Sequence, residues 1–157
     1  MKERIHKALT LSTMAAVLFA GTLAAREQQK DEHGNPQCSN ATLNGSYGVS
    51  ATGTVIGVGS VALIAVFKYD GQGNFTGTVI QKVNGNNVQV TFTGTYVVDA
   101  DCFVSDVTQI SNGQTHTHTS VIVNDGKEFF ILNTTAPTAT SGNVISGVGK
   151  KQFSEDD

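Results

Sequence analysis

The sequence has little charge and no tryptophan, and it lacks the common motifs of nucleotide and hydrolase chemistry. Only 15% of its 157 residues are charged. It contains no glycine-rich phosphate loop, no nucleophile elbow and no zinc-finger spacing. With so few charges, threonine, asparagine and serine must provide much of the polar surface. The many β-branched residues argue against a disordered chain.

The N-terminal segment has the pattern of a secretory signal peptide. Lys2, Arg4 and Lys7 precede an apolar stretch at 8–20 and mainly small residues at 21–25. The apolar stretch is shorter than the ~20 residues that cross a bilayer as a helix, so no membrane span is expected in the mature protein. The pattern predicts a signal peptide over residues 1–25 and an exported, soluble protein in the periplasm or outside the cell.

The mature chain is expected to be acidic. Removing Lys2, Glu3, Arg4 and Lys7 from the 10 basic and 13 acidic residues leaves 7 and 12, a net charge of −5. Such a surface has no electrostatic reason to bind nucleic acid or anionic lipid. Polar composition predicts a flexible lead-in over residues 26–37 and a disordered acidic tail over 153–157.

Two cysteines, Cys38 and Cys102, lie in the mature chain. In an oxidising compartment such a pair most simply forms one disulfide. A metal pair or a catalytic thiol is the alternative, although no histidine lies near either cysteine in the sequence.

Turn-forming pairs such as Asn84-Gly85, Asn112-Gly113 and Asp125-Gly126 recur along the chain after Tyr47. Between such turns, apolar and polar residues alternate as they do in half-buried strands. The pattern predicts eight strands, over residues 46–55, 60–69, 74–83, 87–98, 102–110, 115–123, 127–134 and 143–151.

Short connections make neighbouring strands antiparallel, and pairing of the first strand with the last removes both sheet edges. The predicted fold is therefore all-β, an eight-stranded antiparallel up-and-down barrel over residues 38–152. A two-sheet β-sandwich is the alternative. The interior of an eight-stranded barrel is filled by side chains or holds one small ligand.

Binding of a small apolar ligand inside the barrel is the first functional hypothesis. The residues expected to line its site are Tyr47, Leu63, Phe67, Phe75, Val79, Val90, Phe92 and Tyr96. A self-associating surface or structural protein, a homo-oligomer, is the second, because Ala62, Ile64 and Val66 make the other face of their strand apolar. A cyclase- or isomerase-like enzyme that uses the cavity is the third. No cofactor is expected.

Two carboxylates are candidates for a catalytic acid. Asp106 shares one face of its strand with Val104 and Thr108, and it becomes a buried acid if that face points inward. Glu128 raises the same question beside Phe129 and Phe130.

Two histidines are candidates for metal ligands. His116 and His118 lie on the same face of a predicted strand, because side chains alternate along it. Together they could supply half of a zinc or copper site. The sequence leaves open whether this face points into the barrel.

Three motifs resemble a known group of proteins. They are Cys38-Ser39-Asn40-Ala41-Thr42-Leu43-Asn44-Gly45-Ser46-Tyr47-Gly48, Phe67-Lys68-Tyr69-Asp70-Gly71-Gln72-Gly73-Asn74-Phe75-Thr76-Gly77 and Thr93-Gly94-Thr95-Tyr96-Val97-Val98-Asp99-Ala100-Asp101-Cys102. They are similar to small exported bacterial proteins, mostly uncharacterised, of the allene oxide cyclase-like barrel group. The resemblance covers most of residues 38–151. It implies an eight-stranded antiparallel barrel with a small apolar cavity, and it supports pairing of the two cysteines. Cyclases of that wider group act mainly by folding a hydrophobic substrate in the cavity.

Overall fold

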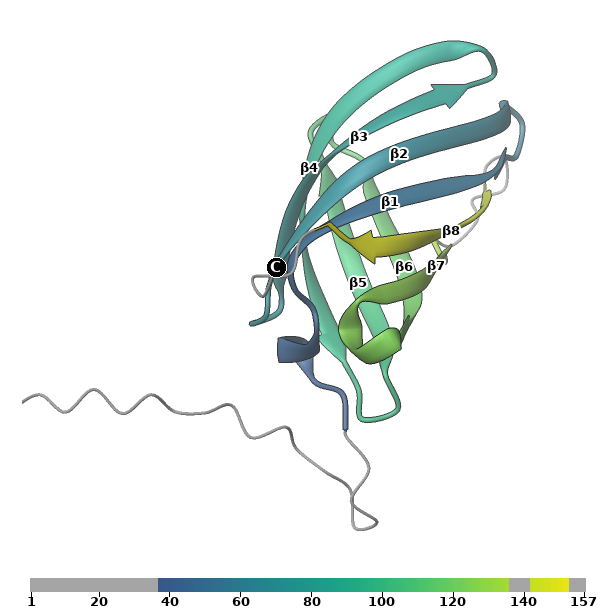
Figure 1. Cartoon of the computed structure of the whole chain (residues 1–157). Helices are drawn as coiled ribbons and strands as arrows, with labels where there is room; N and C mark the ends of the chain where they lie inside the picture. The colour runs from purple at the N-terminus through teal and green to yellow at the C-terminus, as the bar shows by residue number, and fades with distance from the viewer. Residues whose placement is uncertain (1–36, 136–141, 153–157) are drawn as a thin grey trace, which may run out of the picture.

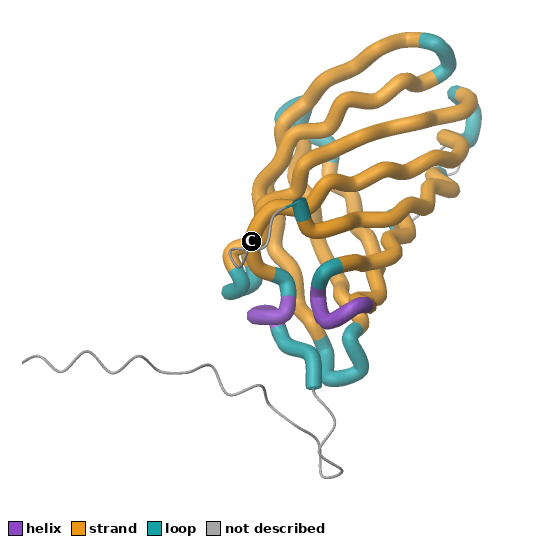
Figure 2. Tube along the Cα trace, viewed as in Figure 1, coloured by secondary structure: helices purple, strands orange, loops and turns teal. Residues whose placement is uncertain are grey.

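The computed structural model describes residues 37–135 and 142–152, which form a closed barrel of eight antiparallel strands in sequence order (Figure 1). Two short 3₁₀ turns lie at the same end of the barrel (Figure 2). The elements are η1 (Asn40–Thr42), β1 (Asn44–Val55), β2 (Gly59–Asp70), β3 (Asn74–Val83), β4 (Asn86–Val98), β5 (Phe103–Ile110), β6 (Thr115–Val123), η2 (Asn124–Gly126), β7 (Glu128–Asn133) and β8 (Asn143–Lys151).

Three of the predicted segments lie largely outside the residues that the structure describes. The predicted signal peptide over 1–25, residues 26–36 of the predicted lead-in and the predicted tail over 153–157 lie outside the described residues. Among the residues that are described, no helix has the length and apolar character needed to cross a membrane.

Pairing of the first strand with the last closes the barrel. The β1–β8 ladder runs antiparallel from Tyr47 opposite Lys151 to Val55 opposite Asn143. This ladder confirms the predicted barrel and excludes the sandwich alternative. Each ladder keeps one register along the described strands, without a bulge.

Side chains alternate between the interior and the outer surface, as the sequence pattern predicts. In β1, Val49 and Ala51 are buried while Ser50 and Thr52 are exposed. No other part of the described chain covers the outer face of β2 at Ile64, which is 61% exposed. The interior is therefore apolar along much of its length, and the outer surface mixes polar and apolar residues.

An aromatic cluster fills one end of the barrel. Its members are Tyr47, Tyr69, Phe75, Tyr96 and Phe129, all buried. Their neighbouring ring centroids are 5.0 to 6.3 Å apart, and several pairs are edge-to-face, a favourable arrangement of aromatic quadrupoles. We call this the closed end.

Glycines make room for the large rings in this barrel. Inward-facing glycines lie directly opposite phenylalanines of the next strand, and a Cβ on any of them would overlap the ring. The pairs are Gly77–Phe92, Gly94–Phe75 and Gly149–Phe129. Because of this overlap, the glycines are needed for close packing of the interior. No bulge occurs at any of them.

The segment around η1 covers the closed end. Leu43 is buried against the aromatic cluster. The Tyr96 hydroxyl donates to the carbonyl oxygens of Asn40 and Leu43, each at 2.9 Å. Burial, and then the charge of Asp70, raise the pKa of Tyr96 to about 12, so this hydroxyl stays protonated. Cys38 and Cys102 form a disulfide, with Cα atoms 5.0 Å apart, that ties this segment to the β4–β5 turn.

Candidate ligand-binding site

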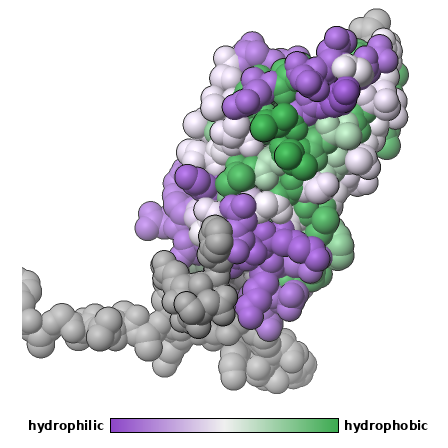
Figure 3. Space-filling model, turned by 45° about the horizontal axis from the view of Figure 1, so that its top comes forward, coloured by the Kyte–Doolittle hydropathy of each residue, from purple (hydrophilic) through white to green (hydrophobic). Residues whose placement is uncertain are grey.

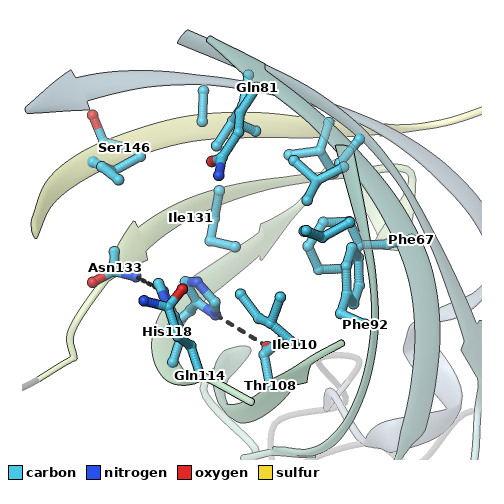
Figure 4. A pocket seen from close by; sticks show the side chains of 18 of the residues that line it. Phe67, Gln81, Phe92, Thr108, Ile110, Gln114, His118, Ile131, Asn133 and Ser146 are labelled. Carbon is cyan, nitrogen blue, oxygen red and sulfur yellow. Dashed lines mark hydrogen bonds between the residues drawn. The ribbon is translucent and has the colours of Figure 1, made fainter. Parts of the chain in front are cut away.

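A cavity of about 120 Å³ opens into the barrel at the end opposite the aromatic cluster (Figure 4). Residues from all eight strands and from the β5–β6 turn line it: Val49, Ala51, Leu63, Ala65, Phe67, Val79, Gln81, Val90, Phe92, Thr108, Ile110, Asn112, Gln114, His116, His118, Ile131, Asn133, Ile145 and Ser146. Typical ligand pockets measure ~300 Å³ or more. This cavity therefore suits a molecule smaller than most drugs.

The two sides of the cavity differ in chemistry. Phe67 of β2 and Phe92 of β4 stand on one side, with ring centroids 4.7 Å apart. Across from them are His118 of β6 and Asn133 of β7 (Figure 4). An apolar wall with a few convergent polar groups is the usual composition of a small-molecule site.

The register of three strands brings the polar groups together. Asp106 lies opposite His118 in the β5–β6 ladder, and His118 lies opposite Asn133 in the β6–β7 ladder. One step further toward the cavity mouth, Thr108 lies opposite His116. All five residues face the interior, because paired positions in antiparallel ladders share a face.

Asp106 is buried behind His118. The side chain of Asp106 is 2% exposed and that of His118 is 16% exposed. The carboxylate Oδ1 accepts from Nδ1 of His118 at 2.8 Å and from the Thr108 hydroxyl at 3.1 Å. A buried carboxylate needs such partners, since burial without them would be costly. Asp106 therefore acts on the cavity through His118, because it does not line the cavity itself.

His116 is held by Asn133. The Asn133 side-chain oxygen accepts from the backbone N–H of Thr135 at 3.2 Å, which sets the orientation of the amide. Its Nδ2 then faces Nδ1 of His116 at 3.4 Å and donates to it. Burial, and then the neighbouring His118, lower the pKa of His116. His116 is therefore neutral at physiological pH and offers its other ring nitrogen as a donor.

The predicted ligand-binding residues divide between the cavity and the closed end. Five of the eight line the cavity: Leu63, Phe67, Val79, Val90 and Phe92. The other three, Tyr47, Phe75 and Tyr96, belong to the aromatic cluster and do not line it. Tyr47 instead donates from its hydroxyl to the Gly126 carbonyl at 2.6 Å.

The remaining candidates take different positions. Glu128 lies outside the cavity. Its carboxylate Oε1 is 3.7 Å from the Lys150 ammonium, so the side chain forms an ion pair on the outer surface and does not contribute to the cavity. His116 and His118 do face inward, as a metal half-site would require. Within residues 37–135 and 142–152, however, no set of three or more histidine, cysteine, aspartate or glutamate side chains could hold a metal ion.

Sequence reasoning did not name several polar residues of the cavity. Gln81 continues the inward face of Phe75, Gly77 and Val79, and Asn133 continues the inward face of β7. Extending each alternation to the end of its strand would have found both. Gln114 lies in the β5–β6 turn, where no alternation applies.

No protein-family model matches the sequence, and no curated protein is significantly similar to it. The geometry of the cavity is therefore the basis for any functional conclusion.

Proposed function

We propose that the protein binds a small, mainly apolar molecule with one polar group inside the barrel. The observation that carries this proposal is the asymmetric cavity, which has an aromatic wall on one side and hydrogen-bonding groups on the other. The closed end is packed with buried rings, so a ligand would enter only through the mouth. The apolar part would lie on Phe67 and Phe92, and the polar group would face His116 and His118.

A pair of alanine variants tests this proposal. Ala65 lines the cavity and is 8% exposed, whereas Ala62 is exposed on the outer face of the same strand. In Ala65→Leu the added carbons occupy the cavity, and in the matched control Ala62→Leu they point into solvent. Binding of phenylacetone, an aromatic ring with one carbonyl group, is measured by calorimetry. We expect Ala65→Leu to weaken binding at least about tenfold, a loss of ~1.4 kcal/mol.

The control variant should bind phenylacetone as the wild type does. Equal binding by all three proteins, or equal loss in both variants, would contradict the cavity as the binding site. Thermal unfolding of each variant checks that Ala65→Leu remains folded, since overpacking usually costs about 1–3 kcal/mol.

We also infer that binding takes place outside the cytoplasm, in the periplasm or beyond the cell. The Cys38–Cys102 disulfide supports this location, because such bonds persist in oxidising compartments. The signal-peptide pattern over residues 1–25 supports export as well. Membership of the allene oxide cyclase-like barrel group is part of the same proposal, and its support is the three motifs within residues 38–102.

Self-association is a second candidate, because a row of apolar side chains crosses the outer surface. Phe103, Val121, Phe130 and Val148 are consecutive partners in the β5–β6–β7–β8 ladders, and we call them the outer row. Phe103 and Phe130 are each 51% exposed. Figure 3 shows hydrophobic surface between hydrophilic regions at the two ends of the face in view. The row carries no charge, so a second copy could cover it without burying an ion.

Sedimentation velocity of the purified protein over a range of concentrations tests this candidate. We expect a dimer or larger assembly that Phe130→Lys converts to monomer, because the lysine would place a charge within the interface. Val97→Lys is the matched control, since Val97 is 66% exposed and lies outside the outer row. A wild-type protein that stays monomeric throughout would rule self-association out.

A further inference from the structure

The side chain of His118 offers the cavity a hydrogen-bond acceptor. Its Nδ1 faces a carboxylate oxygen of Asp106 at 2.8 Å, and that oxygen also accepts from the Thr108 hydroxyl. A carboxylate only accepts hydrogen bonds, so in the neutral imidazole the proton sits on Nδ1. The lone pair is then on Nε2, the ring nitrogen left for the cavity that His118 lines.

The side chain of His116 offers the opposite role. Its Nδ1 accepts from the Asn133 amide at 3.4 Å, and that amide is oriented by the backbone N–H of Thr135. The ring proton of neutral His116 therefore sits on Nε2, which is a donor. The lowered pKa of His116, caused first by its burial, agrees with a neutral ring.

A proton acceptor and a neutral donor thus lie side by side in the cavity wall. The two ring centroids are 6.4 Å apart and the ring planes are inclined by 28°. At this spacing, the α-carbon and the carbonyl oxygen of one small molecule could each face a different ring. We propose that His116 and His118 enolise a small apolar carbonyl compound that has an acidic C–H next to its carbonyl group. This inference rests on the proposed function of the cavity as a binding site.

The reaction step needs no oxidant, reductant or metal. The Nε2 lone pair of His118 takes the proton from the α-carbon, and the C–H electron pair becomes the carbon–carbon double bond of the enolate. The carbonyl π electrons move to oxygen, where the Nε2–H of His116 donates a hydrogen bond to the developing charge. Return of a proton from the His118 imidazolium to the same or a conjugated carbon restores the carbonyl group and the neutral ring.

Asp106 is the positioning residue of this arrangement. It holds His118 by Nδ1 and would stabilise the imidazolium that forms when the proton is taken up. Its side chain is 2% exposed, so water competes little for the carboxylate. Two tyrosines also lie near Asp106. Tyr96 is its partner in the β4–β5 ladder, and burial raises the pKa of Tyr96 to about 12. For Tyr69 of β2, burial, and then the Asp106 charge, raise the pKa well above the usual range. Both tyrosines therefore stay neutral, and the carboxylate remains available to His118.

Hydrogen–deuterium exchange tests the proposal without knowledge of the natural substrate. Phenylacetone is incubated with the full-length protein in D₂O, and loss of its benzylic proton signal is followed by ¹H NMR. We expect saturable exchange with the wild type. His118→Gln should lower the rate constant at saturation by at least about 100-fold, the usual contribution of a general base.

Two further variants separate catalysis from structure. Asp106→Asn should lower the rate constant at saturation by at least about tenfold while the dissociation constant for phenylacetone changes less than about twofold. A purely structural role for Asp106 would instead weaken binding and leave the chemistry of the bound molecule unchanged. Glu128→Gln is the matched control, because it removes a carboxylate outside the cavity and should exchange like the wild type.

Calorimetry on the same samples distinguishes the two ways to fail. If phenylacetone binds to the wild type but exchanges no faster than with His118→Gln, the enolisation proposal is overturned and the binding function stands. Absence of binding would overturn both proposals.

Discussion

Replacing Phe129 with alanine is expected to lower the free energy of unfolding by about 3–5 kcal/mol, the usual cost of removing a buried phenylalanine ring. Phe129 is 0% exposed, and its ring lies 5.5 Å from that of Tyr47 and 6.0 Å from that of Tyr69. It also covers Gly149 of β8, which has no side chain to fill the space. Urea unfolding at equilibrium measures the change.

The neighbouring residue provides a matched control. Phe130 follows Phe129 in β7 but faces outward and is 51% exposed. Phe130→Ala should therefore cost less than about 1 kcal/mol in the monomer. Similar losses of unfolding free energy in the two variants would contradict an inward-facing Phe129 and an outward-facing Phe130.

Removing the disulfide by the double substitution Cys38→Ala and Cys102→Ala is expected to cost about 4 kcal/mol of unfolding free energy. The two cysteines are 64 residues apart in sequence, and the chain-entropy model gives a loss of this size for a loop of that length. The bond also anchors the η1 segment, whose residues Asn40 and Leu43 accept from the Tyr96 hydroxyl over the closed end.

Reduction provides the control for this second prediction. Dithiothreitol should destabilise the wild type to the level of the double variant and leave the double variant unaffected. Wild-type protein that reacts with two equivalents of an alkylating reagent before reduction would show that the bond does not form. A double variant as stable as the oxidised protein would show that the bond contributes nothing.

Strand positions and closure could be predicted because they depend on local patterns. Each strand begins and ends within two residues of its predicted range. The alternation in β4 of Val90, Phe92 and Tyr96 with exposed threonines has one interpretation, a strand with a single buried face. Short turns then dictate antiparallel neighbours, and pairing of β1 with β8 leaves no free edge.

The depth of each residue within the barrel could not be predicted in the same way. Phe75 and Val79 share the inward face of β3, yet Phe75 packs in the closed end and Val79 lines the cavity. The difference depends on how far each strand is shifted along its neighbours, and this shift comes from pairing over the whole barrel. For the same reason the sequence pattern predicts Tyr47 and Tyr96 in the cavity, whereas they lie in the aromatic cluster.

The polar cluster of the cavity could not be predicted, because the pattern within a single strand does not show which of its faces points inward. In β5, Phe103 and Val107 are as apolar as the inward Val104, so alternation alone does not say which face is inside. Cross-strand register resolves the ambiguity, because Asp106 lies opposite Tyr96 on one side and His118 on the other. The sequence could therefore indicate Asp106, His116 and His118 as separate candidates, but the hydrogen bonds that join Asp106 to His118 and Asn133 to His116 emerge only from the folded barrel.

The central claim is that a small molecule binds in the mouth of the barrel between the aromatic wall and the two histidines. NMR titration of protein with ¹³C-labelled isoleucine, leucine and valine methyl groups tests it most directly, with phenylacetone as the ligand. We expect saturable shifts in methyl groups that line the cavity, those of Leu63, Val79, Val90 and Ile131. The outward-facing methyl groups of Ile64 and Ile80 should stay unchanged. Shifts centred on those outer residues, or no saturable shift in the cavity, would contradict the claim.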